Sequence, residues 1–272
     1  MIPRIIHQTW KDRHIPRPWE GSAESWKRHH PGWTYRFWTD EELRDLIRQR
    51  FPRFLRIYDR YPFPIQRVDA ARYALLYEYG GVYSDLDILC NRSLEPLRGY
   101  EVVIPETDPV GYSNDLMLAS RRHSFFRYLM EGLVSAERIN RVPLLPCYPK
   151  VMLSTGSLYL TVRLRRYASR QEISIMPPRL YGSRASSVAY VTHTEGNSWH
   201  RWDGKLIRKL YGLFVGTGSG GPAHSRPDSV PDRRQDRFLN RPADQEGSSA
   251  GSRAPVGLTG DSGFRTAGVW TP

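Results

Sequence analysis

The hydrophobic and polar positions of residues 1–215 alternate between short apolar runs and longer stretches with helical spacing. This alternation favours an α/β layer architecture. Apolar runs predict strands over Ile5–Trp10, Tyr35–Thr39, Val82–Leu86, Glu101–Pro105, Ile173–Met176 and Ala189–Thr194. Spacing near 3.6 residues predicts helices over Glu41–Phe51, Ile65–Tyr79, Phe125–Leu133 and Ser157–Tyr167.

Two local signals give these helices definite ends. Thr39, followed three residues later by Glu42, forms a capping box, which predicts a helix start. The Gly80-Gly81 pair ends the helix over Ile65–Tyr79, because glycine readily adopts left-handed backbone geometry. The strand that follows at once therefore returns beside this helix.

The pattern disappears from Gly216 onward, where Gly, Ser and Pro dominate. This composition predicts a folded domain over 1–215 and a disordered, low-complexity tail over 216–272. The sequence shows no internal repeat, which makes a solenoid or a propeller an unsuitable architecture.

Charge narrows the classes of partner. The 40 Lys and Arg against 28 Asp and Glu give a net charge of +12, which suits nucleic acid, an anionic membrane surface or phosphorylated small molecules. The arginines are scattered and no nucleic-acid-binding motif is present, so we expect no nucleic-acid partner. No apolar run reaches the roughly 18 residues of a membrane span, and a signal peptide is not expected. Cys90 and Cys147 allow at most one disulfide.

Two acids lie at the end of a predicted apolar strand. Asp85 and Asp87 are separated by Leu86, so both carboxylates can emerge on one side where the strand runs into a loop. Hard oxygen ligands in this position suit Mg²⁺ or Mn²⁺ with open coordination positions for a diphosphate. The alternative is a pair of solvated turn acids.

A third acid belongs to the preceding helix. Asp69 and Arg72 are three residues apart and therefore lie on one helix face, and the Gly-Gly turn brings the acidic strand end back toward them. The alternative interpretation is a surface ion pair that contributes little.

In these residues and in the blocks around them, the chain resembles the glycosyltransferases with a DXD sugar-binding region, family 32. The resemblance covers residues 2 to 204 and implies a GT-A fold, a Rossmann-like α/β domain with a mixed central sheet flanked by helices. The matching blocks, in order, are IPRIIHQTW, PGWTYRFWTD, DAARYALLYEYGGVYSDLD, GYSNDLMLASRRHSFF, STGSLYL and HTEGNSWHRWDG.

The resemblance implies roles for four residues around the donor. Trp10 would stack on the nucleotide base, with a buried core tryptophan as the alternative. Asp69 and Arg72 would hydrogen-bond the donor sugar, because a carboxylate accepts from hydroxyls and a guanidinium donates in a fixed fork. Tyr83 would line the same pocket.

The resemblance also implies which residues bind the metal and which face the acceptor. Asp87 would be the direct metal ligand, and Asp85 would contact the ribose or sugar and reach the metal through water. Asn114 and Asp115 would orient hydroxyls, with a turn held by purely local hydrogen bonds as the alternative. The implied catalytic set is Asp69, Arg72, Asp85, Asp87, Asn114 and Asp115.

The last matching block supplies further candidates. His193, Asn197 and Ser198 would make remaining metal or diphosphate contacts, and Trp199 would close over the phosphate with Ser198. The resemblance does not fix which of them binds the metal. Local structural roles are the alternative at each of these positions.

The last three blocks most resemble catalytic subunits of inositol phosphorylceramide mannosyltransferases. This implies metal-dependent, retaining transfer of a hexose with Mn²⁺ or Mg²⁺, most simply mannose from GDP-mannose to inositol phosphorylceramide, with UDP-glucose as the other donor. It also implies Golgi or membrane association and a membrane-anchoring regulatory subunit. The alternatives are transfer to a surface or capsular glycan, or an inactive module that binds sugar nucleotides.

Overall fold

The computed structural model describes residues 1–107, 111–182 and 188–194. Its centre is a six-stranded mixed sheet in the order β2-β1-β3-β6-β5-β7. Strand β1 pairs in parallel with β2 and β3, β6 runs antiparallel to β3 and β5, and β5 is parallel to β7. The strands are β1 (Ile5–Trp10), β2 (Thr34–Thr39), β3 (Gly81–Ser84), β5 (Val102–Pro105), β6 (Leu116–Ala119) and β7 (Ile173–Met176).

The structure also has a second sheet of three strands in the order β4-β9-β8. Its strands are β4 (Ile88–Cys90), β8 (Tyr181–Gly182) and β9 (Val191–His193). The α-helices are α1 (Arg17–His29), α2 (Asp40–Arg50), α3 (Pro52–Arg60), α4 (Pro64–Tyr79), α5 (Ser124–Ala136), α6 (Cys147–Ser154) and α7 (Ser157–Arg166). Short 3₁₀ turns are η1 (Glu95–Leu97), η2 (Glu137–Arg141), η3 (Arg170–Glu172) and η4 (Pro178–Leu180).

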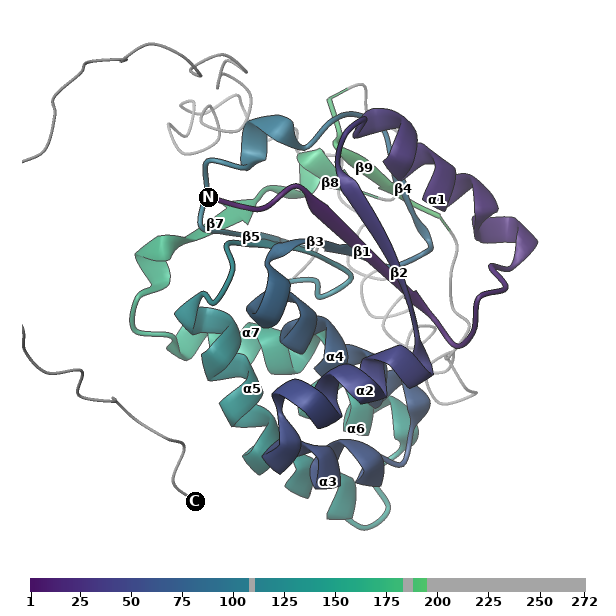
Figure 1. Cartoon of the computed structure of the whole chain (residues 1–272). Helices are drawn as coiled ribbons and strands as arrows, with labels where there is room; N and C mark the ends of the chain where they lie inside the picture. Colours follow the sequence, from purple (N-terminus) through teal and green to yellow (C-terminus); the bar gives the residue numbers. More distant parts are fainter. Residues whose placement is uncertain (108–110, 183–187, 195–272) are drawn as a thin grey trace, which may run out of the picture. The chain divides into compact units, whose positions relative to one another are not determined.

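Two hydrophobic cores lie on the two faces of the central sheet. Helices α2 to α7 gather on one face, and α1 with the small sheet lies on the other (Figure 1). The first core includes Leu75, Phe125 and Leu160, and the second is built around Ile6 and Trp26. The expected α/β class, with a mixed sheet flanked by helices, is thus confirmed.

Most predicted elements are present with small shifts at their ends. The capping box of Thr39 and Glu42 starts α2, and β1 and β7 have the predicted bounds. The strand predicted over Val82–Leu86 instead ends at Ser84. Asp85 leaves the sheet there, and its carboxylate accepts a hydrogen bond from Arg72. The domain limit at 215 and the tail over 216–272 lie outside the described residues.

The Gly80-Gly81 turn sets how α4 and β3 meet. Both glycines have positive φ, 66° and 92°. A Cβ on Gly81 would lie 2.4 Å from the carbonyl oxygen of Ile5, and one on Gly80 would lie 2.7 Å from the amide nitrogen of Arg121. Only glycine fits here, and β3 can therefore pack directly against β1 with the carboxyl ends of both strands at one edge.

His7 ties β1 to this turn from inside the core. The Trp38 indole donates to His7 Nδ1 at 3.1 Å, and His7 Nε2 lies 3.0 Å from the Gly80 carbonyl oxygen. An indole nitrogen can only donate, so Nδ1 accepts and Nε2 carries the proton that it donates to Gly80. The fold therefore requires neutral His7.

This requirement predicts a loss of stability in mild acid. Burial lowers the pKa of His7 to about 4 from 6.5, against the hydrogen bond to Gly80. Below pH 6.5 the unfolded chain binds a proton that the folded chain does not, so the free energy of unfolding falls until about pH 4, by about 3 kcal/mol. Urea unfolding of wild type and His7→Gln between pH 7.5 and 4.5 measures this, and equal pH slopes in the two proteins would contradict it.

Candidate active site

The carboxyl ends of β1 and β3 open into a cleft beside α4. It has a volume of about 210 Å³ and is open to solvent. Its walls come from β1, the start of α2, the first turns of α4 and the Asp85–Asp87 loop. A ligand in this cleft would meet an aromatic surface at one side and carboxylates at the other, lined by Thr9, Trp10, Lys11, Trp19, Asp40, Pro64, Ile65, Val68, Arg72, Asp85, Leu86 and Asp87.

The Asp69–Arg72 pair of α4 is buried. Asp69 is 3% exposed and Arg72 is 2% exposed, with Arg72 Nη2 3.3 Å from Asp69 Oδ1. The surface ion pair considered from the sequence is therefore wrong for these residues. Burying a guanidinium is costly without full pairing, which explains the dense polar network around it.

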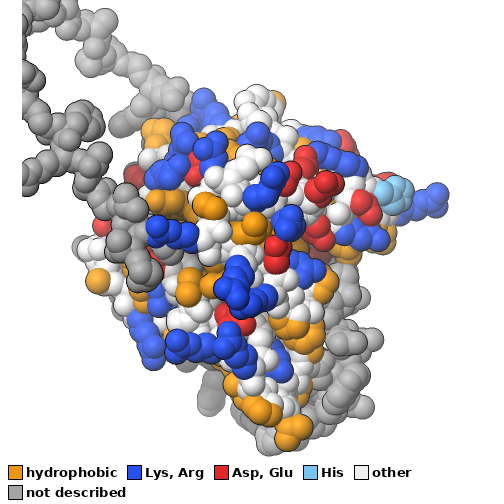
Figure 2. All heavy atoms as spheres, turned by 60° about the horizontal axis from the view of Figure 1, so that its bottom comes forward, with side chains coloured by type: hydrophobic (Ala, Val, Ile, Leu, Met, Phe, Trp, Pro, Cys, Tyr) orange, Lys and Arg blue, Asp and Glu red, His pale blue; other side chains and the backbone are white. Residues whose placement is uncertain are grey.

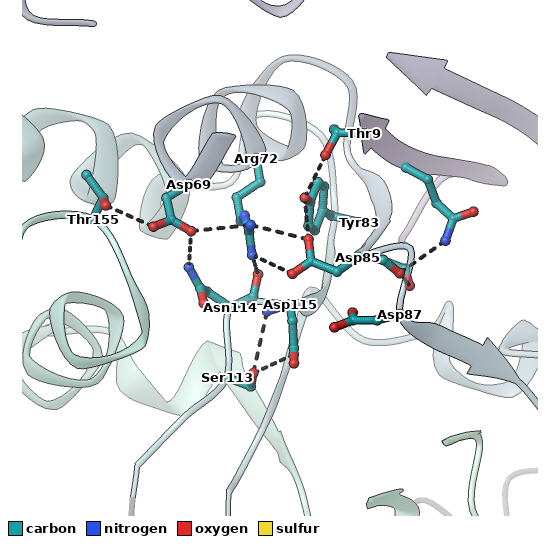
Figure 3. Close-up of polar contacts among 12 residues, drawn as sticks. Thr9, Asp69, Arg72, Tyr83, Asp85, Asp87, Ser113, Asn114, Asp115 and Thr155 are labelled. Carbon is teal, nitrogen blue, oxygen red and sulfur yellow. Dashed lines mark hydrogen bonds and ion pairs between the residues drawn. The ribbon is translucent and has the colours of Figure 1, made fainter. Parts of the chain in front are cut away.

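Arg72 also holds the first acid of the DXD motif (Figure 3). Its Nη1 and Nη2 lie 3.3 and 3.2 Å from Asp85 Oδ2 and Oδ1, and Nη1 donates to the Asn114 carbonyl at 2.6 Å. Tyr83 donates its hydroxyl to Asp85 Oδ1 at 2.6 Å, and its hydroxyl lies 3.1 Å from that of Thr9. Both oxygens of Asp85 are thus engaged by protein donors.

Asp69 is fixed from its other side by two distant segments. Asn114 Nδ2 donates to Asp69 Oδ1, and the Thr155 hydroxyl donates to Oδ2, both at 2.9 Å. Asn114 therefore makes a long-range contact, and the purely local turn considered from the sequence is wrong. Burial raises the pKa of Asp69, and the charge of Arg72 and these two hydrogen bonds oppose the rise.

Asp87 differs from Asp85 because it is left under-satisfied. Its Oδ1 is buried and accepts no hydrogen bond from the described residues. Burial, and then the charge of Asp85, raise the pKa of Asp87 to about 7, against the charge of His193. A buried carboxylate oxygen without a donor is suited to a cation, so the side chain has the chemistry of a metal ligand.

His193 and Asp115 complete the acidic end of the site. His193 Nε2 lies 3.3 Å from Asp115 Oδ2 and 3.7 Å from Asp87 Oδ2. Burial disfavours the charged ring, but Asp115 and then Asp87 outweigh it and raise the pKa of His193 to about 9. Ser113 and Tyr181 donate hydroxyls to Asp115, whose pKa is lowered despite burial by these bonds and by His193.

The described chain does not complete a metal cage by itself. Within 1–107, 111–182 and 188–194, no group of three or more His, Cys, Asp or Glu side chains could hold a metal ion. The candidates Asn197, Ser198 and Trp199 lie outside these residues. A divalent ion bound by Asp87 would need oxygen ligands from a diphosphate or water, as Mg²⁺ sites usually do.

The aromatic side of the cleft contains Trp10 and Trp19. Their rings meet edge to face, with centroids 4.9 Å apart. Trp10 is half-buried at the cleft wall, so the alternative of a fully buried core residue is wrong. Asp40, at the start of α2, stands next to it: its amide donates to the Lys11 carbonyl at 3.4 Å.

Four residues near the site did not enter the sequence-based set: Thr9, Trp19, Asp40 and Thr155. Thr155 lies in STGSLYL, and Trp19 precedes the buried face of α1. No local spacing links either to Asp69 or Trp10. Only the packing of α1, α2 and α6 around the strand ends brings them into the site.

The DXD loop thus lies beside an aromatic cleft at the carboxyl ends of β1 and β3. Residues 16–104 match the family model described as glycosyltransferase sugar-binding region containing DXD motif. This match includes Asp69, Arg72, Asp85 and Asp87, and by it the chain carries the sugar-binding region of the DXD glycosyltransferases.

Curated relatives extend the similarity beyond this region. Inositol phosphoceramide mannosyltransferase 1 of Schizosaccharomyces pombe is 38% identical over 212 residues, 76% of this chain and 65% of that protein. Mannosyl phosphorylinositol ceramide synthase SUR1 of Saccharomyces cerevisiae is 37% identical over 215 residues, 77% of this chain and 55% of that protein. The chain therefore spans between half and two thirds of the length of these relatives.

Among solved structures, the PaToxG glycosyltransferase is similar with a TM-score of 0.49 and 15% identity, covering 89% of this chain and 85% of that one. Within the described residues, no helix combines the length and apolar character that crossing a bilayer requires.

Proposed function

We propose that this protein is a metal-dependent, retaining mannosyltransferase that transfers mannose from GDP-mannose to a hydroxyl of an inositol phosphorylceramide-type glycolipid. The observation that carries the proposal is the buried Asp69–Arg72–Asp85 network placed directly beside the under-satisfied Asp87. Both relatives described above act on this class of sphingolipid by name. An inactive sugar-nucleotide-binding module is disfavoured because Arg72, Asp85 and Asp87 line the cleft and the buried Asp69 holds Arg72 from behind.

Each polar residue has a chemical task in this reaction. Asp69 and Arg72 are preorganised to hold the hydroxyls of the donor sugar, since Asn114 and Thr155 fix the carboxylate and Asp85 fixes the guanidinium. A divalent ion at Asp87 would supply Lewis-acid stabilisation of the departing diphosphate. His193 lies beside Asp115 and Asp87 at the same end of the cleft, with Nε2 3.3 and 3.7 Å from their carboxylates.

The guanine base is favoured by Asp40. Asp40 lines the cleft next to Trp10, and Arg67 is the cation whose charge acts on its carboxylate. A carboxylate only accepts, and guanine offers adjacent N1–H and N2–H donors, whereas uracil offers a single N–H between two carbonyls. We therefore assign Asp40 to the base edge and Trp10, supported by Trp19, to the base face.

A donor panel tests this assignment. With Mn²⁺ present, the wild-type protein is expected to turn over GDP-mannose faster than UDP-glucose and to transfer mannose to inositol phosphorylceramide in detergent micelles. Asp40→Asn should weaken GDP binding about tenfold or more, because a hydrogen bond to a charged group is lost, and should leave UDP binding nearly unchanged. Isothermal titration with both nucleotides measures this.

Glu41→Gln is the matched control, because Glu41 is exposed and does not line the cleft. Equal loss of GDP and UDP binding in Asp40→Asn would contradict the base assignment. Absence of nucleotide binding and of turnover in the wild type would overturn the proposed function.

A further inference from the structure

The segment between η2 and α6 exposes apolar side chains to solvent. Residues 142–146, which we name the apolar tip, read Val-Pro-Leu-Leu-Pro. Leu144 is fully exposed, and Val142 is 45% exposed. Leu144 also has a φ of 60°, a left-handed conformation that is unfavourable for leucine and would suit Asn or Gly. A fully solvated leucine at such a position has no packing role in the described fold.

Basic side chains flank the apolar tip. Arg138 and Arg141 precede it in η2, and Lys150 follows it in α6. Against these three cations stands Glu137, which pairs with Arg141 at 2.9 Å, so residues 137–150 have a net charge of 3 − 1 = +2. Figure 2 shows hydrophobic side chains interspersed with Lys and Arg on the helical side of the molecule. An apolar loop with a basic surround matches an anionic bilayer surface.

Helix α6 connects the apolar tip to the residues that hold Asp69. It leads directly into α6, and the residue after this helix, Thr155, donates its hydroxyl to Asp69. In the same turn, Gln66 of α4 donates to Ser154 at 2.6 Å. A helix of 8 residues is about 12 Å long, so the apolar tip and the donor-sugar network are separated by one short, packed element.

We propose that the apolar tip inserts into the headgroup region of an anionic lipid bilayer and positions the cleft over a lipid-borne acceptor. The proposal rests on the proposed function for the identity of the acceptor, while the insertion itself is a binding event that needs no turnover. Apolar side chains enter the boundary between headgroups and acyl chains, and Arg138, Arg141 and Lys150 meet the lipid phosphates. The headgroup of a neighbouring glycolipid is then within reach of the cleft.

Vesicle binding by the full chain tests the insertion. Vesicles of phosphatidylcholine alone are compared with vesicles containing one third phosphatidylserine, by cosedimentation at physiological salt. The wild type is expected to bind the anionic vesicles and to bind neutral ones much more weakly. Leu144→Asp should reduce binding to the anionic vesicles about tenfold or more, because a charged side chain replaces the apolar one that enters the bilayer boundary.

Gln49→Asp is the matched control: it adds the same charge at an exposed position of α2 and should retain binding. GDP binding is measured for all variants, and it should be unchanged in Leu144→Asp because this side chain contacts no part of the cleft. Equal vesicle binding by wild type and Leu144→Asp, or capture of neither vesicle by the wild type, would overturn the proposal. Vesicle binding that depends on Leu144 in a protein without turnover would support the insertion and refute the proposed function alone.

Discussion

Asp87→Asn is expected to abolish mannosyl transfer without destabilising the fold. The amide keeps the shape of the side chain but binds a divalent ion poorly, and Lewis-acid stabilisation contributes several kcal/mol, so kcat/KM should fall about a thousandfold or more. Stability should be unchanged or higher without metal, because the substitution removes a buried negative charge that faces Asp85 and Asp115.

The two effects are measured together. Transfer assays give kcat/KM, and thermal unfolding with EDTA or with Mn²⁺ and GDP gives the stabilisation by ligand, which should vanish in the variant. Asp45→Asn, an exposed acid on α2 paired with Arg48, serves as the control and should keep both. A variant that retains Mn²⁺-dependent turnover would show that Asp87 is not the direct ligand.

Arg72→Met should be the most destabilising single change in the site. The guanidinium is 2% exposed and contacts the carboxylates of Asp69 and Asp85, so its removal leaves the buried Asp69 and the partly buried Asp85 without a counter-ion. Breaking such a pair costs about 3–5 kcal/mol. Turnover should be lost as well, since Arg72 joins Asp69 to Asp85 in the network proposed to hold the donor sugar.

Urea unfolding of Arg72→Met and Arg44→Met measures this difference. Arg44 makes an ion pair of similar geometry with Asp59 at 2.8 Å, but it is half exposed, so its removal should cost far less. Arg72→Lys should recover part of the stability, because the charge returns without the forked geometry. Equal costs for the two methionine variants would contradict the role assigned to burial.

Those parts of the fold with a local sequence signal could be predicted. The spacing of Asp69 and Arg72, the Gly80-Gly81 turn and the Thr39 capping box depend on neighbouring residues only, and all three are present in the structure. The burial of the Asp69–Arg72 pair had no such signal. It depends on Asn114 and Thr155, which lie 45 and 86 residues further along the chain.

Helix α1 shows why hydrophobic periodicity missed other elements. Its buried face includes Ser22 and Ser25, whose hydroxyls bond the Ile88 carbonyl at 2.6 Å and the Cys90 amide at 2.9 Å. A polar helix face that satisfies the backbone of a strand edge resembles a solvated face in the sequence. The cleft residue Trp19 was missed with it, because its position follows from this packing.

Two hydrogen bonds from Thr194 to the DXD loop affect the order in which the site folds during synthesis. Both the amide and the hydroxyl of Thr194 donate to the Asp87 carbonyl at 2.7 Å, across 107 residues of chain. β4, which begins one residue after Asp87, pairs with β9 just before Thr194. A nascent chain can form α4, β3 and the Arg72 ion pairs early, but the loop that presents Asp87 gains its anchor only when residue 194 has left the ribosome. The loop that presents Asp87 is thus anchored late in synthesis, after α4 and β3 have been made.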